Sequence, residues 1–334
     1  MNDMNRNGRS RRLHAGALLS GVALVVLAGG CSNKTTESTT TGKPDVNDTL
    51  SIAPAANDKK MFVAPFDAVP DSTGRTVYFT AVAPGEGPAV FKASADGSGL
   101  TKLASGAPLV SPFGITISED DQTLLIADTG AETDTEEGGA VLTLSVNGGK
   151  PAALSGTAGT APRGLEVQGD QLYYSGTSGK RPKAVPAVFK IAVVGGTPTA
   201  LVSGLPLKDP SGIAVTRSGD VYVLDTAAAA TRHATVFVVK GGVATAFVPD
   251  VMVGYPGGIA LSQDDTTLFV SALDDTTARD VVFVTNVATK ETSTFTKSIG
   301  KFSESAGLHR ARHASVFAWA DSNANKSGTV FVLK

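Results

Sequence analysis

The stretch Pro210-Ser-Gly-Ile-Ala-Val215 contains the phrase around which the rest of the chain repeats. Related phrases, in which a proline or serine is followed by any residue and then usually by glycine and Ile or Leu, begin at positions 65, 112, 162, 256 and 305. The successive intervals are 47, 50, 48, 46 and 49 residues. A spacing this regular indicates an internal repeat.

Each repeat predicts four short strands. In the fourth repeat, apolar residues at 213–215 are followed by a polar turn with glycine and a second apolar run at 221–223. The third strand, here residues 235–237, is the most uniform of the repeat, and a fourth follows around Phe247. Four antiparallel strands per period of roughly 45–50 residues are typical of a propeller blade. The sequence therefore predicts an all-β, six-bladed β-propeller with four-stranded antiparallel blades.

The sixth repeat reaches only its third strand before Lys334. Its fourth strand must come from another part of the chain, and residues 50–52, ahead of the first repeat, are the one spare apolar segment. We expect this N-terminal strand to pair with the last blade and close the ring, which also protects sheet edges from aggregation.

The N-terminus differs from the repeats in both charge and hydropathy. Arginines at 6, 9, 11 and 12 precede an apolar run at 15–27, and Ala28-Gly-Gly-Cys31 follows. This order resembles a bacterial lipoprotein signal peptide at residues 1–30, although Ala28 stands where that family prefers a Leu-type residue. The apolar run is too short to span a bilayer. The resemblance implies that Cys31, the only cysteine, is the site of lipid attachment.

Beyond the cysteine, residues 31–48 are polar and predict a flexible tether, which leaves residues 49–334 for the propeller. Ser32 after the cysteine resembles lipoproteins sent to an outer membrane, so we expect a lipid-anchored protein of the cell envelope, facing the periplasm or the surface. The formal net charge is −2 without a basic stripe, which argues against nucleic acid as a partner. We expect a monomer.

The repeat resembles that of NHL-type propellers. Residues 210–215 with 219–226, and residues 112–117 with 126–129, carry this resemblance, which covers roughly residues 60–334. The chain is also similar to the SMP-30/gluconolactonase-like hydrolases, a family that holds a divalent cation in the central channel. That resemblance implies Asn and Asp before two of the glycines and Glu near the first phrase. Here the residues before the glycines are Phe113, Arg163, Ser211, Gly257 and Ala306, and the first phrase has no Glu.

Five residues are candidates for ligand binding in the channel. Asp67 stands where other repeats have glycine, and Arg163 and Ser211 precede two of those glycines, so we expect these three at the mouth formed by the repeated phrases. Glu166 and His309 share one inner-strand position in opposite blades. They could act as a catalytic acid and base, or they could be channel-lining groups with satisfied hydrogen bonds. For Asp67 and Arg163 the alternative is a salt bridge across the ring.

Three further aspartates, Asp128, Asp225 and Asp321, end the second strands of alternate blades. They could hold a divalent cation such as Ca²⁺, or each could accept backbone N–H bonds at its strand end. No cofactor is otherwise predicted. The acidic residues 132–137 and the basic residues 180–183 could dock a partner or only increase solubility.

No nucleophile elbow, cysteine cluster or paired-histidine motif is present, so we assign no catalytic residue. The sequence favours a module that binds a ligand or protein through the mouth of its channel, with another envelope protein or a glycan as partner. The alternative is a metal-dependent, lactonase-like hydrolase with atypical ligands in the channel.

Overall fold

The computed structural model of the 334-residue chain describes residues 51–133, 138–229, 233–254, 257–274, 279–295 and 305–334. The predicted signal peptide, the predicted lipid-attachment residue Cys31 and the predicted tether lie outside the described residues, as do residues 134–137 of the acidic loop. No helix in the described part of the chain has the length and apolar character needed to cross a membrane.

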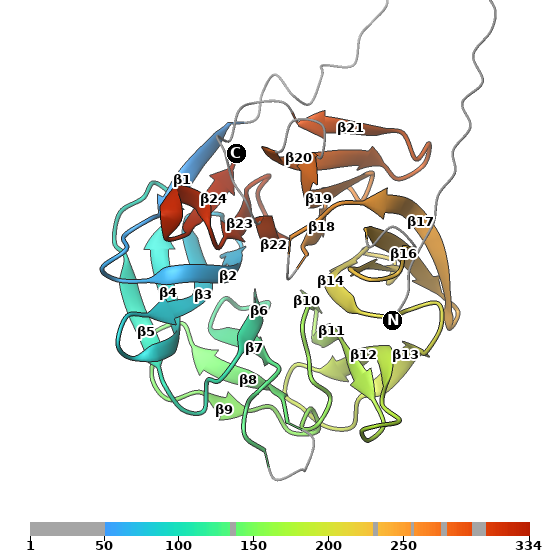
Figure 1. Ribbon diagram of the computed structural model, residues 1–334, viewed down its shortest axis with the longest axis horizontal. Coiled ribbons are helices and arrows are strands. Elements are labelled where there is room, and N and C mark those ends of the chain that lie inside the picture. The colour runs from blue at the N-terminus through green and yellow to red at the C-terminus, as the bar shows by residue number, and fades with distance from the viewer. Residues whose placement is uncertain (1–50, 134–137, 230–232, 255–256, 275–278, 296–304) are drawn as a thin grey trace, which may run out of the picture. The chain divides into compact units, whose positions relative to one another are not determined.

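The described strands form six four-stranded antiparallel sheets, arranged as propeller blades around a central channel (Figure 1). The first three blades follow the chain order directly. Blade 1 contains β2 (Val63–Pro70), β3 (Thr76–Ala83), β4 (Gly87–Ser94) and β5 (Thr101–Ser105). Blade 2 contains β6 (Pro112–Ile117), β7 (Thr123–Asp128), β8 (Ala140–Ser145) and β9 (Ala152–Ala153). Blade 3 contains β10 (Leu165–Gln168), β11 (Gln171–Ser178), β12 (Val185–Ala192) and β13 (Thr199–Ser203).

The last three blades include the one that closes the ring. Blade 4 contains β14 (Pro210–Val215), β15 (Val221–Asp225), β16 (Ala234–Lys240) and β17 (Val243–Val251). Blade 5 contains β18 (Ile259–Leu261), β19 (Thr267–Asp274), β20 (Arg279–Asn286) and β21 (Thr292–Phe295). Blade 6 contains β22 (Ser305–Arg310), β23 (Phe317–Asp321), the short 3₁₀ turn η2 (Ala324–Lys326), β24 (Thr329–Leu333) and the N-terminal strand β1 (Ile52–Ala56).

The ring is closed by β1, which pairs antiparallel with β24 as the outer strand of blade 6. Two further hydrogen bonds join the backbones of Ser51 and Lys334, with N to O distances of 2.7 and 2.9 Å. The predicted closure by the N-terminal segment is therefore confirmed. The strand itself lies a few residues later than the predicted 50–52, because its pairing begins at Ile52 and continues to Ala56.

The apolar core lies between the blades rather than in the channel. The described residues form six apolar clusters, one at each contact between neighbouring blades. In β4, Val90 packs towards blade 2 and Phe91 towards blade 6, and both are fully buried. Because successive side chains of a strand point to opposite faces, the central part of a strand between two neighbouring blades is apolar at consecutive positions, as in residues 89–91. This explains why the third strand is the most uniform in the sequence.

Candidate functional site

The first strands of the blades line the channel and approach one another most closely at the glycines of the repeated phrase. At Gly114, Gly164, Gly212 and Gly258 φ does not lie in the left-handed region, so unusual backbone conformation is not what requires glycine. A Cβ added at Gly212 would lie 2.6 Å from the carbonyl oxygen of Gly257, and at the other three positions it would overlap the backbone of the next blade. Glycine is required because the backbones of neighbouring blades touch.

This contact leaves almost no space in the channel at the level of the glycines. The cavity there, which Asp67, Arg163 and Ser211 help to line, has a volume of about 10 Å³. Such a volume holds at most one water molecule. The channel is thus closed at the end where the repeated phrases begin.

Two of the predicted ligand-binding residues contact neighbouring blades at this closed end. Arg163 forms an ion pair with Asp209 of blade 4. Ser211 is fully buried, and its hydroxyl donates a hydrogen bond of 3.2 Å to the carbonyl oxygen of Gly257. The sequence placed both at an open mouth, but the close approach of the blades leaves no room for a ligand beside them.

The other three candidates, Asp67, Glu166 and His309, meet inside the channel. Oδ2 of Asp67 lies 3.0 Å from Nε2 of His309 and accepts a hydrogen bond of 2.9 Å from the backbone N–H of Ile115. Oδ1 accepts a bond of 2.8 Å from Ala68 N–H. Nδ1 of His309 lies 3.6 Å from Oε2 of Glu166. Because Glu166 and His309 belong to opposite blades, this contact crosses the channel.

The two carboxylates determine the charge of His309. Burial alone would lower the pKa of the imidazole, but Asp67 and Glu166 together raise it from 6.5 to about 10. His309 is therefore protonated at neutral pH and has no free lone pair with which to act as a general base. The cluster is suited to neutralising the buried carboxylate of Asp67 and the partly exposed one of Glu166, and to holding opposite blades together, rather than to acid–base catalysis.

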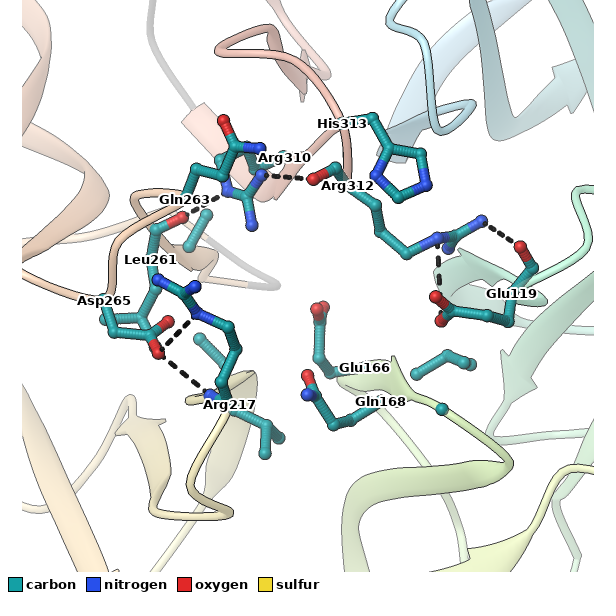
Figure 2. Close-up of a pocket in the computed structure, with 15 residues that line it drawn as sticks. Glu119, Glu166, Gln168, Arg217, Leu261, Gln263, Asp265, Arg310, Arg312 and His313 are labelled. Carbon is teal, nitrogen blue, oxygen red and sulfur yellow. Dashed lines mark hydrogen bonds and ion pairs between the residues drawn. The ribbon is translucent and has the colours of Figure 1, made fainter.

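A larger pocket opens at the opposite end of the channel, where the first strands run into the turns that lead to the second strands. Its volume is about 320 Å³, which is the size of a small-molecule site. Glu166 belongs to both layers, since it lines this pocket and also faces His309. The polar side chains that line this pocket include Glu166, Gln168, Arg217, Gln263, Arg310 and Arg312 (Figure 2).

One wall of this pocket is fixed by Arg312. Its guanidinium donates hydrogen bonds to the carbonyl oxygens of Ile117 and Ser118, at 3.1 and 2.7 Å, and to the carboxylate of Asp121 at 2.6 Å. Asp121 also accepts a bond of 3.1 Å from the backbone N–H of Ser72 in blade 1. The turns of blades 6, 1 and 2 are thereby joined into one rigid wall.

The side of the pocket formed by blades 4, 5 and 6 contains two further arginines, which have fewer partners than Arg312. Nε of Arg217 lies 3.3 Å from a carboxylate oxygen of Asp265, and 66% of the Arg217 side chain is exposed. Nε of Arg310 donates a bond of 2.7 Å to the carbonyl oxygen of Leu261, and its Nη1 donates to the carbonyl oxygens of Ala311 and Arg312. Burial lowers the pKa of Arg310. This wall presents positive charge to the pocket.

The three predicted metal ligands are occupied by backbone groups. Asp128 accepts three backbone N–H bonds at 2.8 to 3.0 Å, and Asp225 accepts bonds from three backbone N–H groups at 2.7 to 3.1 Å. Asp321 accepts two, at 2.7 and 2.9 Å. Burial raises the pKa of Asp225, although the N–H groups of Lys208 and Ala227 oppose the rise. Throughout the described residues, no three His, Cys, Asp or Glu side chains are placed to hold a metal ion together. The proposed three-aspartate Ca²⁺ site is therefore not formed.

The arginines of the pocket are not among the candidates predicted from the sequence, although the repeat itself contains the necessary signal. The residue five positions after the phrase glycine lines the pocket in each of blades 2 to 6. These residues are Glu119, Gly169, Arg217, Gln263 and Arg312. Aligning the repeats at this position identifies a ring of turn residues around one mouth.

No protein-family model matches the chain, and no curated protein matches it in sequence. Several solved structures are similar. A gluconolactonase from Xanthomonas campestris is 15% identical, with a TM-score of 0.59 over 85% of this chain and 89% of its own. The PQQ-bound aldose sugar dehydrogenase of Streptomyces coelicolor is 12% identical, with a TM-score of 0.57 over 85% and 98%. A putative TolB from Agrobacterium tumefaciens is 14% identical, with a TM-score of 0.56 over 85% and 96%. At these identities the similarity shows the propeller fold alone.

Proposed function

We propose that this protein is a lipid-anchored binding module of the cell envelope that holds a small polar ligand in the 320 Å³ pocket. The observation that carries this proposal is the contrast between an open, charged pocket and the closed channel beneath it. A ligand could enter from one side only and would meet side chains on rigid strand ends and short turns. Such preformed, concave sites are typical of small-molecule binding.

The chemistry of the channel favours binding over catalysis. A protonated His309 between two carboxylates lacks the free lone pair that a general base requires. The residues that face the pocket are positioned by hydrogen bonds to backbone carbonyls and to other side chains. They can recognise a polar ligand without transferring a proton to it.

A ligand screen on the full-length protein, purified in detergent, tests the proposed function. Saturation-transfer NMR with panels of neutral sugars, amino acids and organic acids should find binders that Gln168→Trp abolishes, since the indole would fill the pocket. Gln122→Trp, at an exposed turn position outside the pocket, should leave binding unchanged. Absence of binding by any panel at millimolar concentration would refute a small-ligand site, and turnover of a lactone would favour a hydrolase instead.

The lipid anchor is tested separately at Cys31. The wild-type protein should partition into the detergent phase and Cys31→Ser into the aqueous phase, because a diacyl chain confers stable membrane attachment. Equal partitioning of the two proteins would remove the anchor from the proposal without affecting the pocket.

A further inference from the structure

Arg310 is a partly buried cation whose hydrogen-bond acceptors among the described residues are all carbonyl oxygens. Its three hydrogen bonds are accepted by the backbone of Leu261, Ala311 and Arg312, and no carboxylate of the described residues lies within ion-pair distance of it. Its second terminal nitrogen donates to none of the described residues, and Figure 2 shows it pointing towards the middle of the pocket. A partly buried guanidinium without a bonded anion is an incomplete site, because Arg is best satisfied by an oxyanion.

Arg217 adds a second donor on the same side of the pocket. Only its Nε approaches the Asp265 carboxylate, so both terminal nitrogens remain to donate elsewhere. Burial is the main cause of the lowered pKa of Arg310, the carboxylates of Glu166 and Asp265 oppose it, and Arg217 is close enough to lower this pKa by a smaller amount. An anion between the two guanidinium groups would relieve their repulsion.

The structure points to a ligand class: we propose that the pocket binds a small molecule with one oxyanion group, a carboxylate or a phosphate, held by Arg310 and Arg217. This inference rests on the proposed function and specifies its ligand. Arg312 is not part of the anion site, since its guanidinium already binds the Asp121 carboxylate and three carbonyl oxygens.

The rest of the pocket limits the ligand to a single anionic group. Glu166 and Gln168 extend from β10 into the pocket, across from Arg310 and next to Arg217 of the neighbouring blade (Figure 2). The carboxylate of Glu166 would repel a second anion and would accept a hydrogen bond from a hydroxyl or ammonium group. The expected ligand therefore has an oxyanion at one end and a hydrogen-bond donor at the other.

Binding of simple probes to the full-length protein tests this inference. Acetate and inorganic phosphate supply the two oxyanions, glycerol and sorbitol are neutral, and ethylammonium is a cation. We expect acetate or phosphate to bind in the pocket, with the affinity measured by NMR titration. Arg217→Gln should weaken this binding at least about tenfold, because a charge-assisted hydrogen bond to the anion is lost. Arg75→Gln, in the exposed β2–β3 turn, is the matched control and should bind as the wild type does.

Arg310→Gln should weaken the binding of the same probes. It also removes three hydrogen bonds to carbonyl oxygens, so if this variant does not fold, the test rests on Arg217→Gln. Acetate against phosphate distinguishes the two oxyanions. If both anions bind equally well to the Arg217→Gln and Arg75→Gln variants, the anion site is refuted. If only glycerol or sorbitol binds, and Gln168→Trp abolishes that binding, the inference fails while the proposed function stands. If none of the probes and none of the ligand panels binds, both fail.

Discussion

The two ends of the channel are formed by the same strands but present different atoms to it. At one end the phrase glycines bring backbone against backbone and leave about 10 Å³ of space, whereas at the other end side chains surround about 320 Å³. The third blade shows how one segment does both. All five residues from Gly164 to Gln168 border the two cavities, but the side chains of Leu165 and Val167 are buried in the apolar contact with blade 2.

Five residues of one strand therefore pass three layers of the channel: the backbone contact at the glycines, the charged layer of Asp67, His309 and Glu166, and the pocket. Each layer depends on a different interaction, so each should respond differently to substitution. Contact between backbones tolerates no added atom, the charged layer requires its cation, and the pocket wall requires its hydrogen bonds.

The closed end should give the largest effect. Gly164→Ala would drive a Cβ into the carbonyl of Ser211 on the next blade, and the blades cannot separate without loosening their apolar contacts. We expect a loss of about 3 kcal/mol or more in the free energy of unfolding, measured by urea denaturation. Gly138→Ala is the control, because among the described residues a Cβ at the exposed Gly138 would meet only the carbonyl oxygen of Thr129, at 4.0 Å, and its effect should stay within about 0.5 kcal/mol. Equal effects at the two positions would show that the ring is not in contact at the glycines.

The charged layer should come next. His309→Gln leaves the carboxylates of Asp67 and Glu166 without the cation between them, so we expect the free energy of unfolding to fall by about 3 kcal/mol. Adding Asp67→Asn to this variant removes one uncompensated charge and should restore part of the loss. A double-mutant cycle in urea measures the coupling. Additive effects of the two substitutions would contradict an interaction between them.

The same layer predicts a pH dependence. The pKa of His309 is raised from 6.5 to about 10 by its carboxylate neighbours, so its contribution to stability is complete below pH 6.5 and declines as the pH rises towards 10. The free energy of unfolding should fall with increasing pH by up to about 1.4 kcal/mol per unit in this interval. Urea titrations between neutral pH and pH 9.5 avoid the region above 10 in which Tyr78 and Tyr174, with pKa values raised by burial to about 12, also contribute. His309→Gln should make the profile flatter, and an unchanged slope would rule His309 out as its source.

The fold could be predicted from the sequence because its key contact repeats. In five of the six phrases this position is a glycine whose added Cβ would overlap atoms of a neighbouring blade. In the remaining phrase the position is Asp67, whose carboxylate lies in the channel. Glu166 and His309 were recognisable as equivalent positions in opposite blades, and the structure brings them within 3.6 Å. The protonation of His309 could not be predicted from the sequence, because its pKa depends on burial and on the position of Asp67 in the folded protein.

The pocket was harder to predict: of the five candidate ligand-binding residues only Glu166 lines it, and Asp67, Arg163 and Ser211 line the small cavity at the level of the glycines. An arginine in a polar turn, such as Arg217, has the same sequence pattern whether its side chain is solvated or faces a cavity. Only the convergence of turns from five blades distinguishes the two cases. For Asp128 the sequence left a metal ligand and an acceptor of backbone N–H bonds as alternatives, and the structure supports the second.

The smallest stability effect is expected at the open end, where two arginines of one pocket should behave in opposite ways. Arg312→Gln removes hydrogen bonds that join blades 6 and 2, so we expect a loss of about 2 kcal/mol in urea denaturation and little change in acetate binding. Arg217→Gln should weaken acetate binding with almost no loss of stability, because two thirds of its side chain is exposed. If Arg312→Gln instead abolished binding and left stability intact, the division of this pocket into a structural wall and a binding wall would be wrong.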